Sequence, residues 1–214
     1  MKAIKDDNIR FLVNWTLIST ILIPLGAFLG GIVGLSVSAA FGYGYNGGES
    51  PIVITVVYCS WGTVMTVIIS FMQWRMLSKK IGLSYFWIPR SVLGIIIGES
   101  IAGIILWKLD IQRGDLGWAQ GGSILAESLI FAFSGTLIGI FQYPLLRKSY
   151  YKAEMWILAS TIAWGFIPLV IFIFGGLTLG AITGISLIWI LKLKKITLTS
   201  SEAGLHHHRE FERG

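Results

Sequence analysis

The chain is a succession of long apolar runs separated by short polar segments. A helix needs ~20 mostly apolar residues to cross the hydrocarbon core of a bilayer. Six segments meet that length and are predicted to span a membrane: 11–36, 52–77, 85–107, 121–145, 154–174 and 176–194. The predicted fold class is therefore all-α, a polytopic membrane helix bundle. Residues 1–195 form the membrane domain in this interpretation, and residues 196–214 form a cytoplasmic C-terminal tail.

Two of these segments are irregular. The first apolar run is overlong and contains Pro24, which predicts a kink, a tilt or a helical extension beyond the bilayer. It is also much longer than the ~7–15 apolar residues of a signal peptide, so we expect it to stay in the mature protein. The fifth and sixth spans form one unbroken apolar stretch, and we expect the turn between them at Gly175 and Gly176.

Composition supports a lipid environment. Apolar residues make up 54% of the chain and charged residues only 13%, with a mean hydropathy of +0.74. Soluble domains carry about 25% charged residues, so this chain has too little polar surface for a water-facing globule. Its one cysteine, Cys59, excludes an internal disulfide and a cysteine-based metal cluster.

The placement of charge predicts the topology. The formal net charge is +6, and fifteen of the seventeen basic residues lie at the two ends of the chain or in the turns after the second and fourth spans, including the span ends beside those turns. The opposite loops, 42–51, 108–120 and 175–176, carry only Lys108 and Arg113. Basic residues stay on the cytoplasmic side, so both termini are expected there. The charge therefore reflects topology, and we expect no nucleic-acid partner.

One segment occurs twice. Residues 73–87 and 142–156 each begin with Gln and an aromatic residue, carry Leu four positions later and reach Trp fourteen positions on. We interpret each as a tight cytoplasmic turn between two helices. Gln73 and Gln142 are predicted to hydrogen-bond backbone groups or the indoles of Trp87 and Trp156 across the turn.

The repeat extends beyond these turns. Trp15, Trp87 and Trp156 each open an odd-numbered span, 72 and 69 residues apart. The even-numbered spans align as well, although Leu187 stands where the third copy would carry Gln. The chain is thus predicted to be three copies of a two-helix hairpin around a pseudo-threefold axis. Equivalent positions in the even spans are Thr66 and Ser70, Gly135 and Gly139, and Gly180 and Gly184.

Glycines four residues apart lie on one helix face and allow another backbone to approach closely. Two alternatives follow: packing inside the bundle, or an interface with a partner subunit. The sets are Gly26, Gly30 and Gly34; Gly94 and Gly98; Gly135 and Gly139; and Gly176, Gly180 and Gly184.

Two carboxylates lie inside apolar spans. A charge near the bilayer centre is costly, so Glu99 and Glu127 are expected to face the bundle interior or a cavity. Both lie ~12–14 Å from the outer boundary by residue count, on consecutive antiparallel helices, so we expect them at one level. Either they form a site for a proton, a cation or an amine ligand, or they hold helices together through hydrogen bonds.

Signatures of enzymes are missing. The spans contain no His, and the chain has neither a His-Glu-x-x-His nor a Gly-x-Ser-x-Gly motif. The adjacent His206, His207 and His208 belong to the tail, where solvated side chains are expected. We therefore expect no enzymatic activity, no cofactor and no metal.

The segments 139–148 and 155–165 carry a Gln-aromatic turn followed by Trp-x-x-x-Ser. They resemble a loose group of uncharacterised multi-pass membrane proteins of cyanobacteria and related bacteria, which show Gln-Trp-x-x-Leu turns. Tyr143 and Pro144 depart from that pattern. The resemblance implies a bacterial cell membrane, or a thylakoid membrane, as the location.

Two functional hypotheses follow. The first is a non-enzymatic membrane subunit or scaffold that packs against a membrane-protein partner, or its own copies, through glycine-rich faces. The second is a small transporter or channel with a proton, cation or ligand site at Glu99 and Glu127. A water-accessible cavity reaching the glutamates would favour the second.

Overall fold

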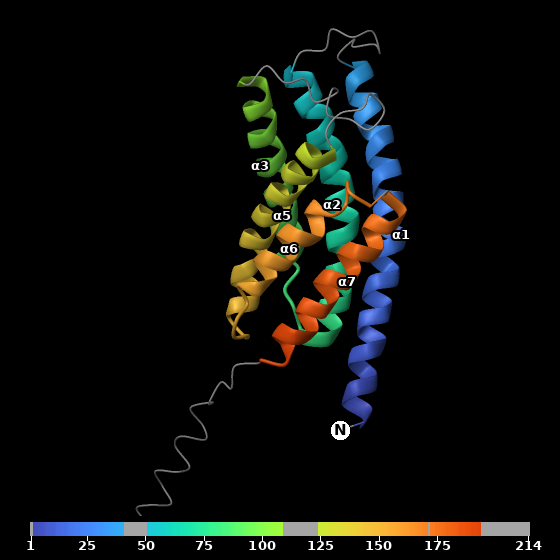
Figure 1. Cartoon of the computed structure of the whole chain (residues 1–214), viewed down its shortest axis with the longest axis vertical. Helices are drawn as coiled ribbons and strands as arrows, with labels where there is room; N and C mark the ends of the chain where they lie inside the picture. Colours follow the sequence, from blue (N-terminus) through green and yellow to red (C-terminus); the bar gives the residue numbers. More distant parts are fainter. Residues whose placement is uncertain (1, 41–50, 109–123, 171, 194–214) are drawn as a thin grey trace, which may run out of the picture.

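The computed structural model describes residues 2–40, 51–108, 124–170 and 172–193. The predicted all-α class is confirmed, and the described residues form six helices (Figure 1). They are α1 (Lys2–Ala40), α2 (Pro51–Ile81), α3 (Trp87–Lys108), α5 (Ile124–Arg147), α6 (Met155–Gly165) and α7 (Phe172–Leu191). The predicted tail, 196–214, and most of the loops 42–51 and 108–120 lie outside the described residues.

Five of these helices, α1, α2, α3, α5 and α7, are long and apolar enough to cross a membrane. Helix α6 has 11 residues, which is a length of about 16 Å against a hydrocarbon core of about 30 Å. The third hairpin therefore contains one short apolar helix in place of the predicted span 154–174.

The turn between α6 and α7 lies at residues 166–170, so its prediction at Gly175 and Gly176 was wrong. Pro168 lies in this turn, where its missing N–H costs no helical hydrogen bond. The chain tightens just before it: the Ile167 N–H donates to the Trp164 carbonyl, three residues back, at 3.1 Å. Gly175 and Gly176 lie within α7.

Helix α1 continues through Pro24 as one element of 39 residues. This is about 58 Å at 1.5 Å per residue, well beyond the hydrocarbon thickness. Of the predicted alternatives for this run, the helical extension is present. The N-terminal part of α1 projects past the other helices at one end of the bundle (Figure 1).

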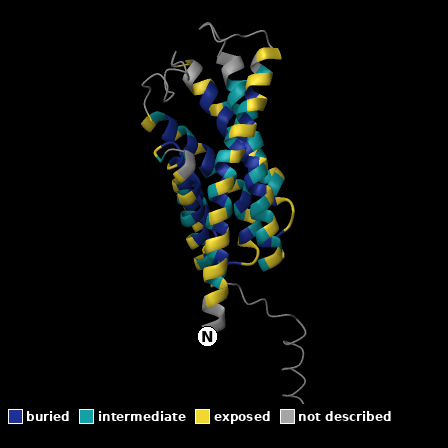
Figure 2. Ribbon diagram, turned by 90° about the vertical axis from the view of Figure 1, so that its right-hand side faces the viewer, coloured by how far each residue is buried: buried dark blue, intermediate teal, exposed yellow. Residues whose placement is uncertain are grey.

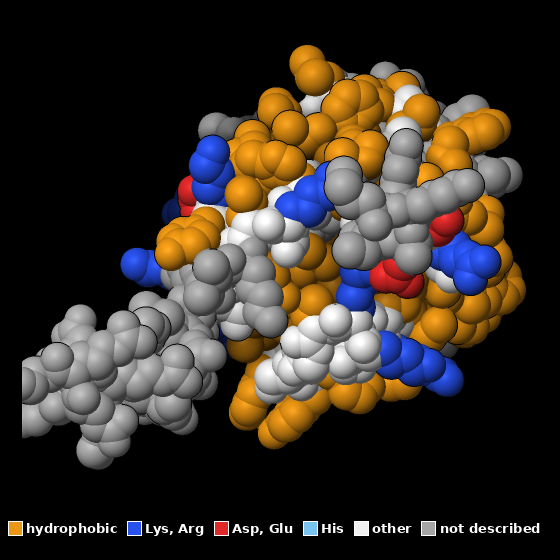
Figure 3. All heavy atoms as spheres, turned by 90° about the horizontal axis from the view of Figure 1, so that it is seen from below, with side chains coloured by type: hydrophobic (Ala, Val, Ile, Leu, Met, Phe, Trp, Pro, Cys, Tyr) orange, Lys and Arg blue, Asp and Glu red, His pale blue; other side chains and the backbone are white. Residues whose placement is uncertain are grey.

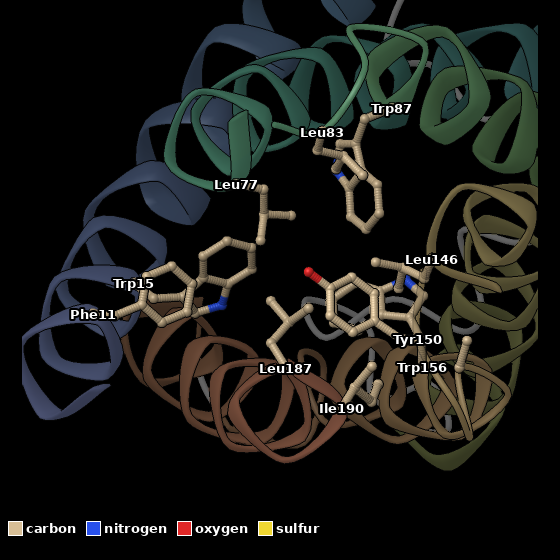
Figure 4. Close-up of a cluster of buried hydrophobic side chains, with 11 residues drawn as sticks. Phe11, Trp15, Leu77, Leu83, Trp87, Leu146, Tyr150, Trp156, Leu187 and Ile190 are labelled. Carbon is tan, nitrogen blue, oxygen red and sulfur yellow. The ribbon is translucent and has the colours of Figure 1, made fainter. Parts of the chain in front are cut away.

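The helices form a closed ring. Each helix packs against the next in chain order, and α7 returns to pack against α1. Figure 4 shows the ribbons arranged around a group of buried side chains. Parallel copies of a hairpin produce such a ring when the first and last copies meet, so the arrangement fits the predicted pseudo-threefold repeat.

The outer surface of the ring is apolar. Large side chains such as Ile21, Phe28 and Leu129 are about two-thirds exposed. Exposed and buried residues alternate along the helices, so that one side of each helix is buried (Figure 2). The start of α1, the turns 82–86 and 148–154 and the end of α7 lie at one end of the bundle (Figure 1). Seen from that end, Lys and Arg side chains surround an apolar surface (Figure 3). A lipid-facing belt with a basic end has this distribution.

Candidate functional site

The repeated turns contain the hydrogen bonds expected from their sequence. The Trp87 indole N–H donates to Gln73 Oε1 at 3.3 Å, and the Trp156 indole donates to Gln142 Oε1 at 2.6 Å. The first bond links α3 to α2 and the second links α6 to α5, so each joins the first helix of a hairpin to the last helix of the preceding hairpin. Both indoles are at most 1% exposed, so a missing acceptor would leave a buried donor unpaired.

The third indole uses a different partner. Trp15 Nε1 of α1 donates to Thr183 Oγ1 of α7 at 2.9 Å. Thr183 lies four residues, about one helical turn, before Leu187, the residue at the position of the missing glutamine. The Thr183 hydroxyl in turn donates to the Leu179 carbonyl at 2.5 Å. The same interaction therefore recurs at all three junctions between hairpins, with a threonine in place of the glutamine at the junction that closes the ring.

Serines join the Trp, Gln and Thr side chains described above, and together these hydrogen-bonded groups form a polar layer across the ring. Gln142 Nε2 donates to Ser91 Oγ at 2.6 Å, and Ser91 donates to the Trp87 carbonyl at 2.7 Å. Ser19 makes the equivalent bond to the Trp15 carbonyl at 2.8 Å. Sequence reasoning missed Ser91 and Thr183 as part of the site. The recurrence of Ser four residues after Trp was the available signal for Ser91, whereas Thr183 had none.

Between this layer and the basic end of the bundle, an apolar cluster fills the ring (Figure 4). The three indoles belong to it, as the repeat predicts for residues of equivalent depth. Tyr150, from the turn between α5 and α6, points its ring into the centre of the cluster. Burial raises the pKa of the Tyr150 phenol. The cluster consists of Phe11, Trp15, Leu77, Leu83, Trp87, Leu146, Tyr150, Ala153, Trp156, Leu187 and Ile190.

A small cavity lies beside the Trp156 indole, on the side of the polar layer away from the basic end of the ring. The volume open to the centre of a water molecule is about 10 Å³. Its polar lining comes from all helices except α1: Thr66, Ser70, Gln73, Ser91, Gln142, Trp156, Ser160 and Thr183. Apolar side chains such as Ile69, Ile138 and Leu179 complete the wall. The cavity is too small for an organic substrate, since ligand pockets span about 300–1,000 Å³.

A larger hollow opens at the basic end, with a volume of about 690 Å³. Lys80 at its rim pairs with Asp7 at 3.0 Å, which joins the projecting start of α1 to the end of α2. Tyr150 lies in its wall and also belongs to the apolar cluster. The hollow is therefore separated from the small polar cavity by packed side chains. Its lining residues are Asp7, Asn8, Lys80, Ile81, Ser149, Tyr150, Ile188, Leu191 and Lys192.

Both candidate glutamates face the interior, with 3% of Glu99 and 5% of Glu127 exposed. Ser134 of α5 donates to Glu99 Oε1 at 3.3 Å. Glu99 also lies beside α2, because a Cβ placed on Gly62 would be 3.7 Å from its Cγ. Glu99 thus contacts both helices that flank α3. Neither glutamate lines the two cavities described above.

The two glutamates do not share a level. Gly98 packs against Ser134, since a Cβ on Gly98 would lie 2.6 Å from Ser134 Oγ. Glu127 lies seven residues before Ser134 on α5, which is about 10 Å along the helix. The prediction of one common level was wrong because it counted residues from an assumed outer boundary of the membrane on each helix. The side-chain register between α3 and α5, set by Gly94 and Gly98, decides the level.

The glycine sets pack inside the ring. A Cβ on Gly98, Gly135 or Gly180 would lie within 2.6–2.7 Å of an atom of the neighbouring helix, closer than Cβ atoms approach. Of the two predicted alternatives, packing inside the bundle therefore applies, and these faces are not open to a partner. The helix pairs and their glycines are α1–α2 (Gly26, Gly30, Gly34), α3–α5 (Gly94, Gly98), α5–α6 (Gly135, Gly139) and α7–α1 (Gly176, Gly180, Gly184).

No metal site is formed by the His, Cys, Asp and Glu side chains that the structure describes, and the three tail histidines lie outside them.

Comparison with known proteins found no matching family model, no matching curated protein and no matching solved structure. The fold itself defines the class: a membrane-type helix bundle in which three hairpins close into a ring held by Trp hydrogen bonds and glycine contacts.

Proposed function

We propose that this protein is a non-enzymatic integral membrane protein that acts as a subunit or scaffold of a larger membrane assembly. The observation that carries the proposal is the closed ring with a centre filled by its own side chains. Such a ring gives a rigid body with an apolar outer belt. A rigid body of this kind suits the positioning of neighbouring proteins in the membrane.

The geometry gives less support to a transporter centred on the glutamates. The central cavity has room for about one water molecule, and neither glutamate lines it. The apolar cluster of the basic end contributes Trp156 to the cavity wall, and a second apolar cluster contributes Ile69, Ile138, Trp164 and Leu179. Packed apolar side chains therefore adjoin the cavity on two sides. The hydrogen bond from Ser134 to Glu99 favours the alternative in which this carboxylate holds α3 against α5.

The proposed partner contacts are on the outer belt, because the glycine faces are already used within the ring. Exposed apolar side chains recur every three or four residues along α1, from Ile9 to Leu35, and so share one face of that helix. The stretch is about 39 Å long and exceeds a hydrocarbon core of about 30 Å. A membrane-protein partner, a second copy of this chain and lipid are the candidates to cover it.

We further propose a bacterial cell membrane or a thylakoid membrane as the location, with both termini cytoplasmic. The basic residues at one end of the described bundle support this orientation. Reporter fusions at residues 46, 113 and 214 test it. A fusion at 214 that reports a periplasmic position, or one at 46 or 113 that reports a cytoplasmic position, would contradict the orientation.

The role is tested by purification from native membranes in mild detergent, followed by cross-linking and mass spectrometry. We expect a stoichiometric partner or homo-oligomer with cross-links to the outer belt. In parallel, the purified protein in liposomes should pass neither protons nor monovalent cations. A monomer without cross-linked partners, together with a flux abolished by Glu99→Gln or Glu127→Gln, would replace the scaffold by the transporter.

A further inference from the structure

We propose that the small polar cavity inside the ring is a binding site for one water molecule, held by Thr66 of α2 and by neighbouring polar groups of the lining. Such a water would complete the centre of the ring whatever the protein assembles with, so its binding does not depend on the scaffold role.

The first observation is the Thr66 hydroxyl. Thr66 is 2% exposed, and its Oγ1 has no hydrogen-bond partner among the residues that the structure describes. Buried hydroxyls in folded proteins nearly always have a partner, either a protein group or an ordered water. Thr66 lines the cavity, so a molecule bound there is within reach of its hydroxyl.

The second observation is the match between the cavity and water. A cavity needs roughly 10–15 Å³ for the centre of a water molecule, and bound waters use 2–4 polar partners. This cavity provides about 10 Å³. Several other hydroxyl and amide groups lie in the same wall, among them Ser70, Gln73 and Ser160. Apolar cavities stay empty even at about 150 Å³, whereas a polar cavity with room for one molecule favours a water.

The lining also determines the charge of the ligand. No Asp, Glu, Lys or Arg belongs to the wall, so a neutral ligand is favoured over an ion at this depth. The Gln142 amide is already committed, since Oε1 accepts from Trp156 and Nε2 donates to Ser91. Gln73 accepts from Trp87 through Oε1, which leaves its amide N–H groups as donors on the α2 side.

The repeat explains why the cavity lies beside α2. Thr66 and Ser70 occupy the positions of Gly135 and Gly139 in α5 and of Gly180 and Gly184 in α7. Gly135 and Gly180 bring their helices against α6 and α1, with no room for a Cβ. Helix α2 carries side chains at these positions, so its backbone cannot approach a neighbour in the same way. The hydroxyls bound a cavity there instead.

The decisive experiment compares Thr66→Val, which keeps the shape and removes the hydroxyl, with Thr178→Val as a matched control. The Thr178 hydroxyl bonds to carbonyls of its own helix and lines neither cavity. Thermal unfolding is measured in detergent for both variants and for Thr66→Ser. An experimental structure of the wild type is determined at a resolution that shows ordered waters.

If water is bound, Thr66→Val removes one of its partners and should lower the melting temperature by about 2–4 °C relative to Thr178→Val. Thr66→Ser should stay near the wild type, and density for one water should lie within hydrogen-bond distance of Thr66 Oγ1. If the cavity is dry, Thr66→Val removes an unpaired hydroxyl and should raise the melting temperature or leave it unchanged. Absence of the density overturns the proposal, whichever way the melting temperature moves.

Discussion

The Trp15 indole of α1 hydrogen-bonds the Thr183 hydroxyl of α7 at 2.9 Å, across 168 residues of sequence. This contact joins the first and last helices and so closes the ring. It also stands in for the Trp–Gln bonds of the other two junctions, which span only 14 residues each. A change at this junction therefore tests both the closure of the ring and the repeat.

Replacement of Thr183 by Val leaves the Trp15 N–H without its acceptor in the core. We expect a loss of about 1–3 kcal/mol in unfolding free energy, the cost of an unsatisfied buried donor. Adding Leu187→Gln to Thr183→Val restores the residue that the other two copies carry, and should recover part of the loss. Unfolding in mild detergent with a chemical denaturant measures both. No recovery in the double variant would argue against equivalent positions in the three copies.

Gln142→Leu should be the most destabilising change in the polar layer. The amide bonds both Trp156 and Ser91 at 2.6 Å. Its loss leaves the buried Trp156 N–H unpaired, at about 1–3 kcal/mol, and also removes the bond to Ser91, which keeps its own bond to the Trp87 carbonyl. Gln73→Leu is the matched variant. Its bond to Trp87 is longer, 3.3 Å, and its side chain is only partly buried, so the loss should be smaller. Equal effects on the unfolding free energy would contradict this ranking.

Gly98→Ala should destabilise the α3–α5 contact. Its Cβ would lie 2.6 Å from Ser134 Oγ and 2.9 Å from the Ser134 Cα, so the helices must move apart. Overpacking of this kind costs about 1–3 kcal/mol. Gly31→Ala in α1 is the control, because the described residues place no atom within 4 Å of the added Cβ, apart from the nearby backbone of α1 itself. There the gain in helix propensity should leave stability unchanged or raise it by up to about 1 kcal/mol.

Glu99→Gln should be tolerated, because an amide oxygen can still accept from Ser134. Glu99→Leu removes the acceptor and should lower the unfolding free energy by about 1–3 kcal/mol. The two variants are compared by thermal unfolding in the same detergent. A strong loss in Glu99→Gln would mean that the charge itself stabilises the fold, against the interpretation of Glu99 as a hydrogen-bonding link between helices.

Tyr150 predicts the behaviour of the protein in alkali. Burial raises its pKa in the folded state above the value of 10.0 for a free phenol. The unfolded chain therefore ionises first, and the contribution of Tyr150 to stability is complete below pH 10. It is lost as the pH rises from 10 through the folded pKa. Tyr150→Phe should remove this component of the pH dependence, whereas Tyr85→Phe, at an exposed position, should retain it.

Local patterns predicted much of the site. The spacing of Gln73 to Trp87 and of Gln142 to Trp156 led to two hydrogen bonds that the structure contains. These bonds join neighbours in the chain, so the sequence between them limits their geometry. Burial of Glu99 and Glu127 was also predictable. A charged side chain inside a membrane span costs free energy if it faces lipid, whichever helices surround that span. The relative level of the two glutamates was not predictable, because it depends on the register between two helices.

The sequence alone determined the class of protein, the hairpin repeat and the internal position of polar residues. These features follow from the length, apolar content and residue spacing of a single helix or turn. They can therefore be predicted without knowing which helices pack against it. Tertiary structure decided that the hairpins close into a ring and that Thr183, in place of a glutamine, accepts the hydrogen bond of Trp15. It also decided that the glycine faces pack against neighbouring helices of the same ring. Each of these depends on which helix faces lie against each other, and that is decided by packing across the whole ring.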